Sequence, residues 1–560
     1  MLRHTLLSSA VLSVACGLIT SAPALAGDET LTTIFTVNNA GRPLTDGDTW
    51  VITSTGGIQV TLFEGISGEV DNFTLTNDGS ITAKNPGPIF FPPFATTGIS
   101  LLGDNNTITN NGTIETTDFD AIDLTGTSQR VTNNGTITSG DDGIDTNSNN
   151  DVIVNNGTIT AARDGIETDG MGVTVTNAGT IVASSDAYDL NGDNSTLNLV
   201  LGSNSQGEFS FDGANATFNI GTGMNGAFTT DGGNPDTITA ARNAFLQDGN
   251  TIFALNLDQN LLGLTHLVNM GGALQETTQG QGRFGRNDVA TRGATKSAGP
   301  WITMSSDYSQ GLSTSQSAGY STRAGQITIG FALGDTIGAF AATNSARFQR
   351  NGSFETDSNT QAVGLYGQVD LEGADLSWTL ALGQASNSAQ RQVQNNTVAG
   401  GFETATGDYD QTFVAPRLTY STRLQPGVML DVEIGYTQIN ADGYTETGAT
   451  NNATFAARNT RVASVTPKVS WTTIGSDIPF DMSAGVELRR YWGDPVNVTI
   501  GAANGSFTDA DSRFEAKAFV GGRIERPFGD GWLLTGFGQA GYSTYNAVSL
   551  NADFMISRSF

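Results

Sequence analysis

The sequence predicts an all-β protein, in which a right-handed parallel β-helix is followed by a 12-stranded antiparallel transmembrane β-barrel. Three observations predict this fold class. The first half repeats with a period of about 22 residues, and the second half consists of stretches in which apolar and polar residues alternate. The composition is that of a turn-rich β chain, because only 14% of the 560 residues are charged whereas 70 are glycine.

Composition and charge exclude several classes of function. The net charge of −29 repels phosphates, and we see no basic patch to overcome it, so no nucleic acid partner is expected. The chain has two histidines, His4 and His266. This excludes a multi-histidine zinc site and leaves almost nothing from which to build a Ser/His/Asp triad.

Residues 1–26 have the pattern of a signal peptide. Arg3 and His4 precede an apolar run over residues 6–19, and Ala24-x-Ala26 fits signal-peptidase cleavage before Gly27. The run is shorter than a membrane-spanning helix requires. The one cysteine, Cys16, lies within this segment, so the mature chain is expected to lack disulfides and thiolate sites.

Residues 27–260 contain the repeat. Gly112, Gly135, Gly157 and Gly179 follow one another at intervals of 22 or 23 residues within copies of a motif such as Ile-Thr-Asn-Asn-Gly-Thr-Ile. Stacked coils should bury two isoleucine ladders. These ladders are Ile114, Ile137, Ile159 and Ile181, and Ile122, Ile144 and Ile166. An asparagine ladder, expected in turns, consists of Asn110, Asn133, Asn155 and Asn177.

Residues 301–560 are predicted to form the barrel. From Val428 to Tyr436, for example, every second residue is apolar, so one face suits lipid and the other an aqueous lumen. Such stretches begin near residues 301, 326, 335, 359, 376, 410, 427, 461, 478, 513, 531 and 547. Five of the six tryptophans and ten of the eleven tyrosines lie in this half, as the aromatic girdles of a barrel require.

The order of signal peptide, β-helical repeats and a barrel ending in Phe560 resembles a monomeric (type V) autotransporter of Gram-negative bacteria. The resemblance covers essentially the whole chain, including the Gly299-Pro300-Trp301 entry to the barrel. It implies an outer-membrane barrel that secretes or displays its own passenger, residues 27–260, at the cell surface. The implied partners are the outer-membrane lipid bilayer and the barrel assembly machinery, which reads the last strand.

The last strand departs from the family pattern at one position. Phe554, Ile556 and Phe560 fit the alternating assembly signal, but Arg558 stands where an aromatic or apolar residue is usual. This departure bears on how efficiently the strand is recognised and leaves the predicted fold unchanged.

The family also implies a helix that threads the barrel before its first strand, within the linker 261–300. Residues 261–276 are the candidate, and a capping helix on the last β-helix coil is an equal alternative. Some relatives cleave themselves between paired asparagines in this helix. The candidate contains only Asn269, so no such cleavage is expected.

Two acidic ladders are the sharpest chemical feature of the repeats. They consist of Asp120, Asp142, Asp164 and Asp186, and of Asp123, Asp145, Glu167 and Asp189. Carboxylates stacked at the spacing between strands repel one another, and calcium prefers such oxygen ligands. The sequence therefore leaves two interpretations open, namely solvated turn carboxylates without a cofactor or a ladder of Ca²⁺ ligands.

The passenger is expected to be an adhesin or another surface-interaction domain that meets an unknown extracellular receptor or glycan. A polysaccharide-acting enzyme is one alternative, with Asp142 and Asp145 or Asp164 and Glu167 as acid/base pairs. Catalysis needs one distinct environment, however, whereas this pattern recurs in every coil. A purely structural surface protein is the other alternative.

An insertion over residues 84–94 interrupts the repeats with prolines and aromatic residues. Phe90, Phe91 and Phe94 are candidate partner-binding residues, because solenoids often carry binding loops at such insertions. The alternative is a loop that folds its rings over the N-terminal end of the β-helix.

Overall fold

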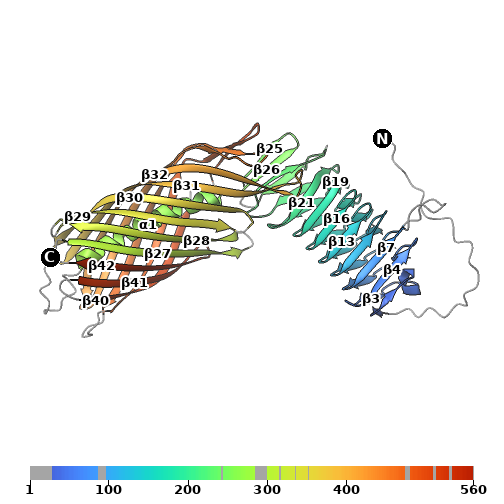
Figure 1. Cartoon of the computed structure of the whole chain (residues 1–560), viewed down its shortest axis with the longest axis horizontal. Coiled ribbons are helices and arrows are strands. Elements are labelled where there is room, and N and C mark those ends of the chain that lie inside the picture. The colour runs from blue at the N-terminus through green and yellow to red at the C-terminus, as the bar shows by residue number, and fades with distance from the viewer. Residues whose placement is uncertain are drawn as a thin grey trace, which may run out of the picture.

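The protein consists of a parallel β-solenoid and a β-barrel, joined end to end (Figure 1). The computed structural model describes residues 28–85, 96–231, 233–240, 244–283, 299–314, 317–333, 336–350, 352–472, 480–508, 513–528 and 532–558. The predicted fold class, a β-helix followed by a closed 12-stranded antiparallel barrel, is confirmed.

One wall of the solenoid is a ten-stranded parallel sheet with one strand from each coil. In spatial order its strands are β1 (Glu29–Leu31), β3 (Thr49–Ile52), β6 (Thr74–Asn77), β9 (Thr107–Asn110), β12 (Arg130–Asn133), β15 (Val152–Asn155), β18 (Thr174–Asn177), β20 (Thr196–Leu199), β22 (Thr217–Ile220) and β24 (Thr237–Ala240). A short 3-10 helix, η1 (Asn38–Gly41), lies at the N-terminal end.

The other walls form one parallel sheet folded around a corner. The first row is β2 (Ile34–Phe35), β4 (Gly57–Thr61), β7 (Ser80–Lys84), β10 (Thr113–Thr116), β13 (Thr136–Ser139) and β16 (Thr158–Ala161). The second row is β5 (Ile66–Glu69), β8 (Ile99–Leu102), β11 (Ile122–Thr125), β14 (Ile144–Thr146) and β17 (Ile166–Thr168). The long strand β19 (Thr180–Leu190) continues both rows and pairs with β21 (Asn204–Phe211).

The isoleucine ladders lie where the repeat predicts them. Ile114 pairs in register with Ile137 on the next coil, and Ile122 pairs with Ile144. All seven isoleucines of the two ladders are completely buried. Removing stacked apolar side chains from water is the main stabilising term of a coil that has no core of its own.

The asparagine ladder lies elsewhere than predicted. Asn110, Asn133, Asn155 and Asn177 end the strands of the first wall, and their buried amides point into the core. Each amide donates to the next along the stack, for example Asn110 Nδ2 to Asn133 Oδ1 at 2.8 Å. The left-handed turn positions are taken by a different set, Asn72, Asn105, Ser128, Asn150, Asn194 and Asn215. The predicted turn position is therefore wrong, whereas the predicted amide bonding is present.

Twelve antiparallel strands form the barrel. They are β27 (Gly299–Thr314), β28 (Ser317–Ala332), β29 (Ile337–Arg350), β30 (Phe354–Leu371), β31 (Ala374–Asn395), β32 (Phe402–Gln425), β33 (Val428–Ala441), β36 (Arg458–Thr472), β37 (Phe480–Gly493), β40 (Phe514–Phe528), β41 (Trp532–Ser543) and β42 (Ala547–Arg558). The barrel closes because β27 pairs with β42 and every other strand pairs with its neighbours in the chain order of these twelve.

Some barrel strands extend beyond the alternating stretches that predicted them. β28, β30 and β32 begin between five and nine residues before the predicted starts at 326, 359 and 410. β31 has 22 residues and β32 has 24. A small separate sheet contains β34 (Tyr444–Thr445), β35 (Ala453–Phe455), β38 (Val496–Ile500) and β39 (Ala503–Phe507).

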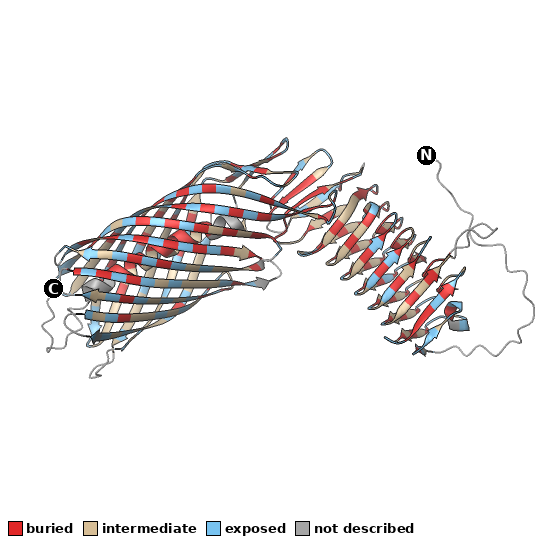
Figure 2. Cartoon of the chain, viewed as in Figure 1, coloured by how far each residue is buried: buried red, intermediate tan, exposed pale blue. Residues whose placement is uncertain are grey.

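The barrel exposes apolar side chains and encloses polar ones, which is the reverse of the solenoid. Ile434 is 54% exposed and Val520 is 61% exposed, whereas Asp431 and Arg417 of the same wall are buried. Figure 2 shows buried residues alternating with exposed residues along the barrel strands. Such a surface is stable against lipid.

The described residues contain one α-helix, α1 (Asp258–Arg283), which lies inside the barrel (Figure 1). No helix in this part of the chain is both long enough and apolar enough to cross a bilayer.

Candidate functional site: the barrel lumen and its junction with the solenoid

Apolar contacts hold helix α1 in the barrel lumen. Its buried face carries Leu264, Leu267, Val268, Met270 and Leu274. These side chains pack in one cluster with wall residues that include Trp301, Phe340, Phe413 and Tyr491. The 26-residue helix has a length of about 39 Å, which is enough to follow the lumen from one end toward the other.

Buried arginines attach the polar side of the helix to the wall. Arg417 Nη2 donates to the backbone oxygen of Val268 at 2.7 Å, while its Nη1 binds Glu433 Oε1 at 2.7 Å. Arg489 Nη2 donates to Asn269 Oδ1 at 2.7 Å. Each of these buried guanidinium groups thus binds a carboxylate and a helix oxygen together, and the carboxylate that Arg489 binds is that of Glu487.

Glycine in the helix gives Arg417 its position. A Cβ atom on Gly271 would lie 3.2 Å from both Nε and Nη2 of Arg417, so a larger residue would push the guanidinium away. The next turn is held by Lys468 Nζ, which donates to Glu276 Oε1 at 3.2 Å. A polar cavity of about 100 Å³ remains between helix and wall, bordered by Glu276, Lys468 and Asp431.

At the solenoid end of the helix, one serine of the barrel ties three segments together. Ser353 Oγ donates to the backbone oxygen of Gly223 at 2.7 Å and accepts from Asn225 Nδ2 and Asn256 Nδ2 at 3.2 and 3.1 Å. Arg350 Nη2 donates to Asp258 Oδ2 at 2.9 Å in the first helical turn. The start of the helix is therefore fixed to both the last coil and the barrel rim.

The hairpin between β31 and β32 joins the barrel directly to the solenoid. Its residue Asn396 donates through Nδ2 to the backbone oxygens of Gly207 and Thr229 at 2.9 and 2.8 Å, and accepts the Thr229 amide at 2.8 Å. The backbone oxygen of Asn396 also accepts the Gly207 amide at 2.9 Å. A single barrel residue thus satisfies backbone groups at the open end of the solenoid.

Backbone pairing continues this joint. β23 (Gly226–Thr229) pairs in parallel with the end of β31, and antiparallel with β26 (Thr251–Leu255), which pairs with β25 (Ala244–Asp248). The solenoid edge is therefore covered by strands of this region and of the barrel, instead of being left open for another chain.

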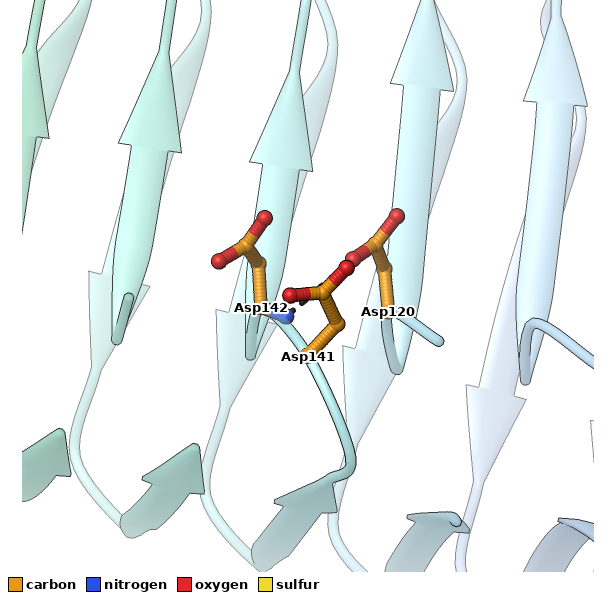
Figure 3. Close-up of side chains that lie close together, drawn as sticks. All are labelled: Asp120, Asp141 and Asp142. Atoms are coloured by element: carbon orange, nitrogen blue, oxygen red, sulfur yellow. Dashed lines mark hydrogen bonds between the residues drawn. The ribbon is translucent and has the colours of Figure 1, made fainter. Parts of the chain in front are cut away.

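The first acidic ladder is bonded to the backbone of the solenoid. Asp142 N donates to Asp120 Oδ1 at 3.1 Å (Figure 3). The amides of Asp164 and Asp186 donate in the same way to Asp142 and Asp164, both at 2.9 Å. Each of these carboxylates thus accepts the amide one coil further on, which gives the ladder a role in holding the coils in register.

Arg163 lies among these carboxylates. It binds Asp141 Oδ1 at 2.9 Å and Glu167 Oε2 at 2.7 Å, and it forms a close ion pair with the buried Asp142. Two groups of carboxylates near Arg163 could each hold a metal ion. One group is Asp120, Asp141 and Asp142, and the other is Asp142, Asp164 and Glu167. Both groups contain carboxylates that are already paired with the Arg163 guanidinium. Calcium at these positions would compete with Arg163.

A third group, Asp186, Glu208 and Asp231, forms no ion pair with a basic side chain in the described part of the chain. Its carboxylate oxygens lie within 4.8 Å of one another. The donor set consists of oxygen atoms and suits a hard cation, although calcium usually takes six to eight such ligands. The calcium hypothesis therefore stays a prediction, and this group is the place to test it.

The second ladder consists of half-buried carboxylates in direct register. Asp123 pairs with Asp145, Asp145 with Glu167, and Glu167 with Asp189. Burial, followed by the nearby Glu167 and Asp123, raises the pKa of Asp145 to about 8. Burial raises the pKa of Glu167 to about 7 against the opposing effect of Arg163. Part of the ladder therefore carries protons near neutral pH.

The other predicted site residues occupy different parts of the molecule. Phe90, Phe91, Phe94 and Phe560 lie outside the described residues. Phe554 and Ile556 are exposed on the outer face of β42, 62% and 38% respectively. Arg558, at the position that departs from the family pattern, places its guanidinium 5.2 Å from the Trp532 ring centre.

Sequence reasoning missed the residues that bind the helix and the solenoid to the barrel. Arg417, Glu433, Glu487 and Arg489 occupy lumen positions of alternating strands, so a charged residue in the polar face of a strand was a usable signal. Asn396 had no such signal, because it lies in a polar hairpin whose partners are almost 170 residues or more away in the chain.

Comparison with known proteins gives the barrel a family. Residues 300–535 match the family model described as the autotransporter beta-domain. The comparison with curated proteins gave no match.

Three solved autotransporter domains are similar to part of the chain. The translocator domain of the autotransporter NalP from Neisseria meningitidis is 15% identical to the chain, with a TM-score of 0.41. The alignment covers 53% of this chain and 98% of that domain. The β-domain of the Bordetella autotransporter BrkA is 15% identical, with a TM-score of 0.35 and coverages of 47% and 100%. The transport unit of AIDA-I from Escherichia coli is 11% identical, with a TM-score of 0.32 and coverages of 52% and 98%.

The family match covers the barrel strands from β27 to β40 and the start of β41, and a β-helix precedes it in the chain. An autotransporter β-domain implies insertion into the outer membrane. Residues 300–535 are therefore assigned to the autotransporter beta-domain family.

Proposed function

We propose that the barrel carries its own β-helix across the outer membrane and holds it at the cell surface as an interaction domain, with adhesion as its role. The observation that carries this proposal is the joint between the two parts. Asn396, Ser353 and the pairing of β23 with β31 attach the last coil to the barrel rim through buried hydrogen bonds. A passenger built into the rim in this way is suited to display.

The path of the chain supports the same conclusion. The last coil leads into α1, which runs through the lumen, and the first barrel strand β27 starts beside the end of β42 at Trp301 and Ser557. The polypeptide thus passes from the solenoid through the barrel. The solenoid end of the barrel is then the extracellular end.

The acidic ladders favour an interaction domain over a polysaccharide-acting enzyme. Asp120, Asp142 and Asp164 accept backbone amides of the next coil, and Asp142 is also paired with Arg163. A general acid or base needs a free carboxyl group that faces substrate. The remaining surface, acidic and regular, is available to a receptor or glycan, and the insertion with Phe90, Phe91 and Phe94 is the proposed contact loop.

Protease shaving of intact expressing cells tests the display. Peptides from residues 28–231 should be released by protease added outside the cell, whereas the barrel strands from residue 299 onward stay protected. The same cells with a permeabilised outer membrane provide the reference in which the protease reaches both sides of the membrane. Protection of both regions in intact cells would contradict display and indicate a solenoid held in the periplasm.

Adhesion needs its own experiment. Cells that display the protein should bind glycan arrays or host-matrix proteins more strongly than cells that display a variant lacking residues 86–95, if the insertion is the contact loop. Equal binding by both, together with intact display, would locate the contact elsewhere on the solenoid. Release of reducing ends from acidic polysaccharides by the same cells would instead support the enzymatic alternative.

A further inference from the structure

The outer face of the barrel carries two arginines side by side where its apolar band ends. On β33, β36 and β37, residues that are paired across the strands form rows, and three successive rows lie on the outer face. From the lipid band toward the solenoid, these rows are Ile434–Val465–Leu488, Tyr436–Ala463–Arg490 and Gln438–Arg461–Trp492. Ile434, Val465 and Leu488 are 54, 42 and 38% exposed, as lipid-facing residues of a barrel are. The rows therefore change from apolar to cationic at the end nearer the solenoid.

The two guanidinium groups have no acidic partner among the residues that the structure describes. Arg461 and Arg490 are diagonal neighbours across β36 and β37, which places their Cβ atoms about 7 Å apart. Both are exposed, and neither forms an ion pair within the described residues. None of the positions in the three rows is acidic. Like charges on one sheet face repel each other, and an anion between them would relieve this repulsion.

The aromatic neighbours mark the level of lipid headgroups. The rings of Tyr436 and Trp492 lie 6.2 Å apart on either side of Ala463, and Phe514 is paired with Arg490 on the next strand. Aromatic girdles of this kind lie at the boundary between hydrocarbon and water. Ala463, whose side chain is small, is paired with Tyr436 and with Arg490 on its two neighbouring strands.

We propose that Arg461 and Arg490 bind the phosphate of an anionic lipid in the outer leaflet, whose acyl chains lie on Ile434, Val465 and Leu488. Arginine pairs bind phosphate through several charge-assisted hydrogen bonds. A lipid is favoured over free phosphate because the cations continue the apolar band without a break. The assignment to the outer leaflet rests on the orientation in the proposed function, in which the solenoid end of the barrel faces the exterior.

Native mass spectrometry of the full-length protein in detergent tests the site directly. The probes are a bisphosphorylated lipid A, the same lipid without its phosphates, and inorganic phosphate. The double variant Arg461→Gln with Arg490→Gln should retain the bisphosphorylated lipid about tenfold less than the unaltered protein. The matched control is Arg347→Gln, because Arg347 is equally outward-facing but is paired with Asp357 and Glu355. This control should retain the lipid as before.

Several outcomes would overturn the proposal. They are undiminished retention by the double variant, equal retention of the dephosphorylated lipid, and displacement of the lipid by equimolar inorganic phosphate. Heat-modifiable electrophoretic mobility verifies that each variant is folded, and the single variants Arg461→Gln and Arg490→Gln replace the glutamine pair if the latter does not fold. The measurement needs no assumption about display, so its failure is distinguishable from a failure of the shaving experiment.

Discussion

The solenoid and the barrel are both built from β-sheets, but the solenoid faces water and the barrel wall faces lipid. The solenoid coils turn apolar residues inward and polar residues outward, as Ile159 and Thr160 illustrate. The barrel strands turn apolar residues outward and enclose residues such as Arg417. Both satisfy their backbone groups through neighbouring strands. The difference shows that the same period-two alternation stabilises a strand against water or against lipid, depending on what lies on the other side.

Charge is distributed in the opposite sense as well. In the solenoid, carboxylates stack on one another near the surface with Arg163 between them. In the barrel, arginines lie inside and bind the helix α1, as Arg417 and Arg489 do. The following predictions test each side of this comparison.

The largest effect is expected from placing a charge in the solenoid core. Ile159→Asp should destabilise the coils around it by about 4 kcal/mol or more, because an unpaired carboxylate would be buried in the isoleucine ladder. Urea unfolding of the full-length protein, followed by hydrogen exchange of peptides from residues 150–170, measures this. Thr160→Asp, on the exposed side of the same strand, is the control and should change stability little. Equal effects of the two would contradict the assigned faces.

A similar loss inside the barrel should follow from Arg417→Met. Glu433 would be left buried without its cation and the Val268 oxygen without its donor, at a cost of about 3 kcal/mol. Hydrogen exchange over residues 264–276 should rise, since the helix loses an attachment to the wall. Arg347→Gln, which removes an exposed arginine from the outer face, serves as the control. Unchanged exchange in the Arg417 variant would mean that apolar packing alone holds the helix.

The substitution Asn396→Ala tests how the solenoid is attached to the barrel. Loss of its three side-chain hydrogen bonds should cost about 2 kcal/mol locally and speed hydrogen exchange in β23, while exchange in the barrel wall stays the same. Ala399→Ser in the same hairpin is a matched control. If exchange in β23 does not change, the strand pairing alone fixes the solenoid to the rim.

Stability of the solenoid should fall as the pH rises from about 5 to about 8. Burial holds the pKa of Asp145 at about 8 and that of Asp120 at about 7, both above the ordinary value. The folded solenoid therefore binds more protons than the unfolded chain in this window, so raising the pH favours unfolding. Hydrogen exchange of the second ladder at both pH values is the measurement, and greater protection at pH 8 would contradict the prediction.

The smallest effect concerns calcium. If the group Asp186, Glu208 and Asp231 binds it with the millimolar affinity of extracellular modules, a few millimolar calcium should stabilise these coils by about 1 kcal/mol at constant ionic strength. Asp231→Asn is the matching variant and should lose the response. An unchanged unfolding curve in the presence of calcium would leave these residues as ordinary surface carboxylates.

The sequence alone was sufficient for the features that depend on local periodicity. The 22-residue repeat placed Ile114 and Ile137 in one buried ladder, and alternation identified twelve strands and the outward face of Ile434. It was insufficient where the environment of a polar residue depends on neighbouring coils. Asn110 was expected in a turn, yet it ends a strand with a buried amide, because the amides of adjacent coils satisfy one another.

The sequence by itself therefore determined the two architectures, their order and the inward or outward direction of most apolar residues. These follow from how each short segment partitions between water, lipid and core. Only the tertiary structure decided that Arg417 meets Val268, that Arg163 lies among the carboxylates and that Asn396 closes the solenoid. Such contacts join residues far apart in the chain, and their formation depends on strand register and closure, which no local pattern specifies.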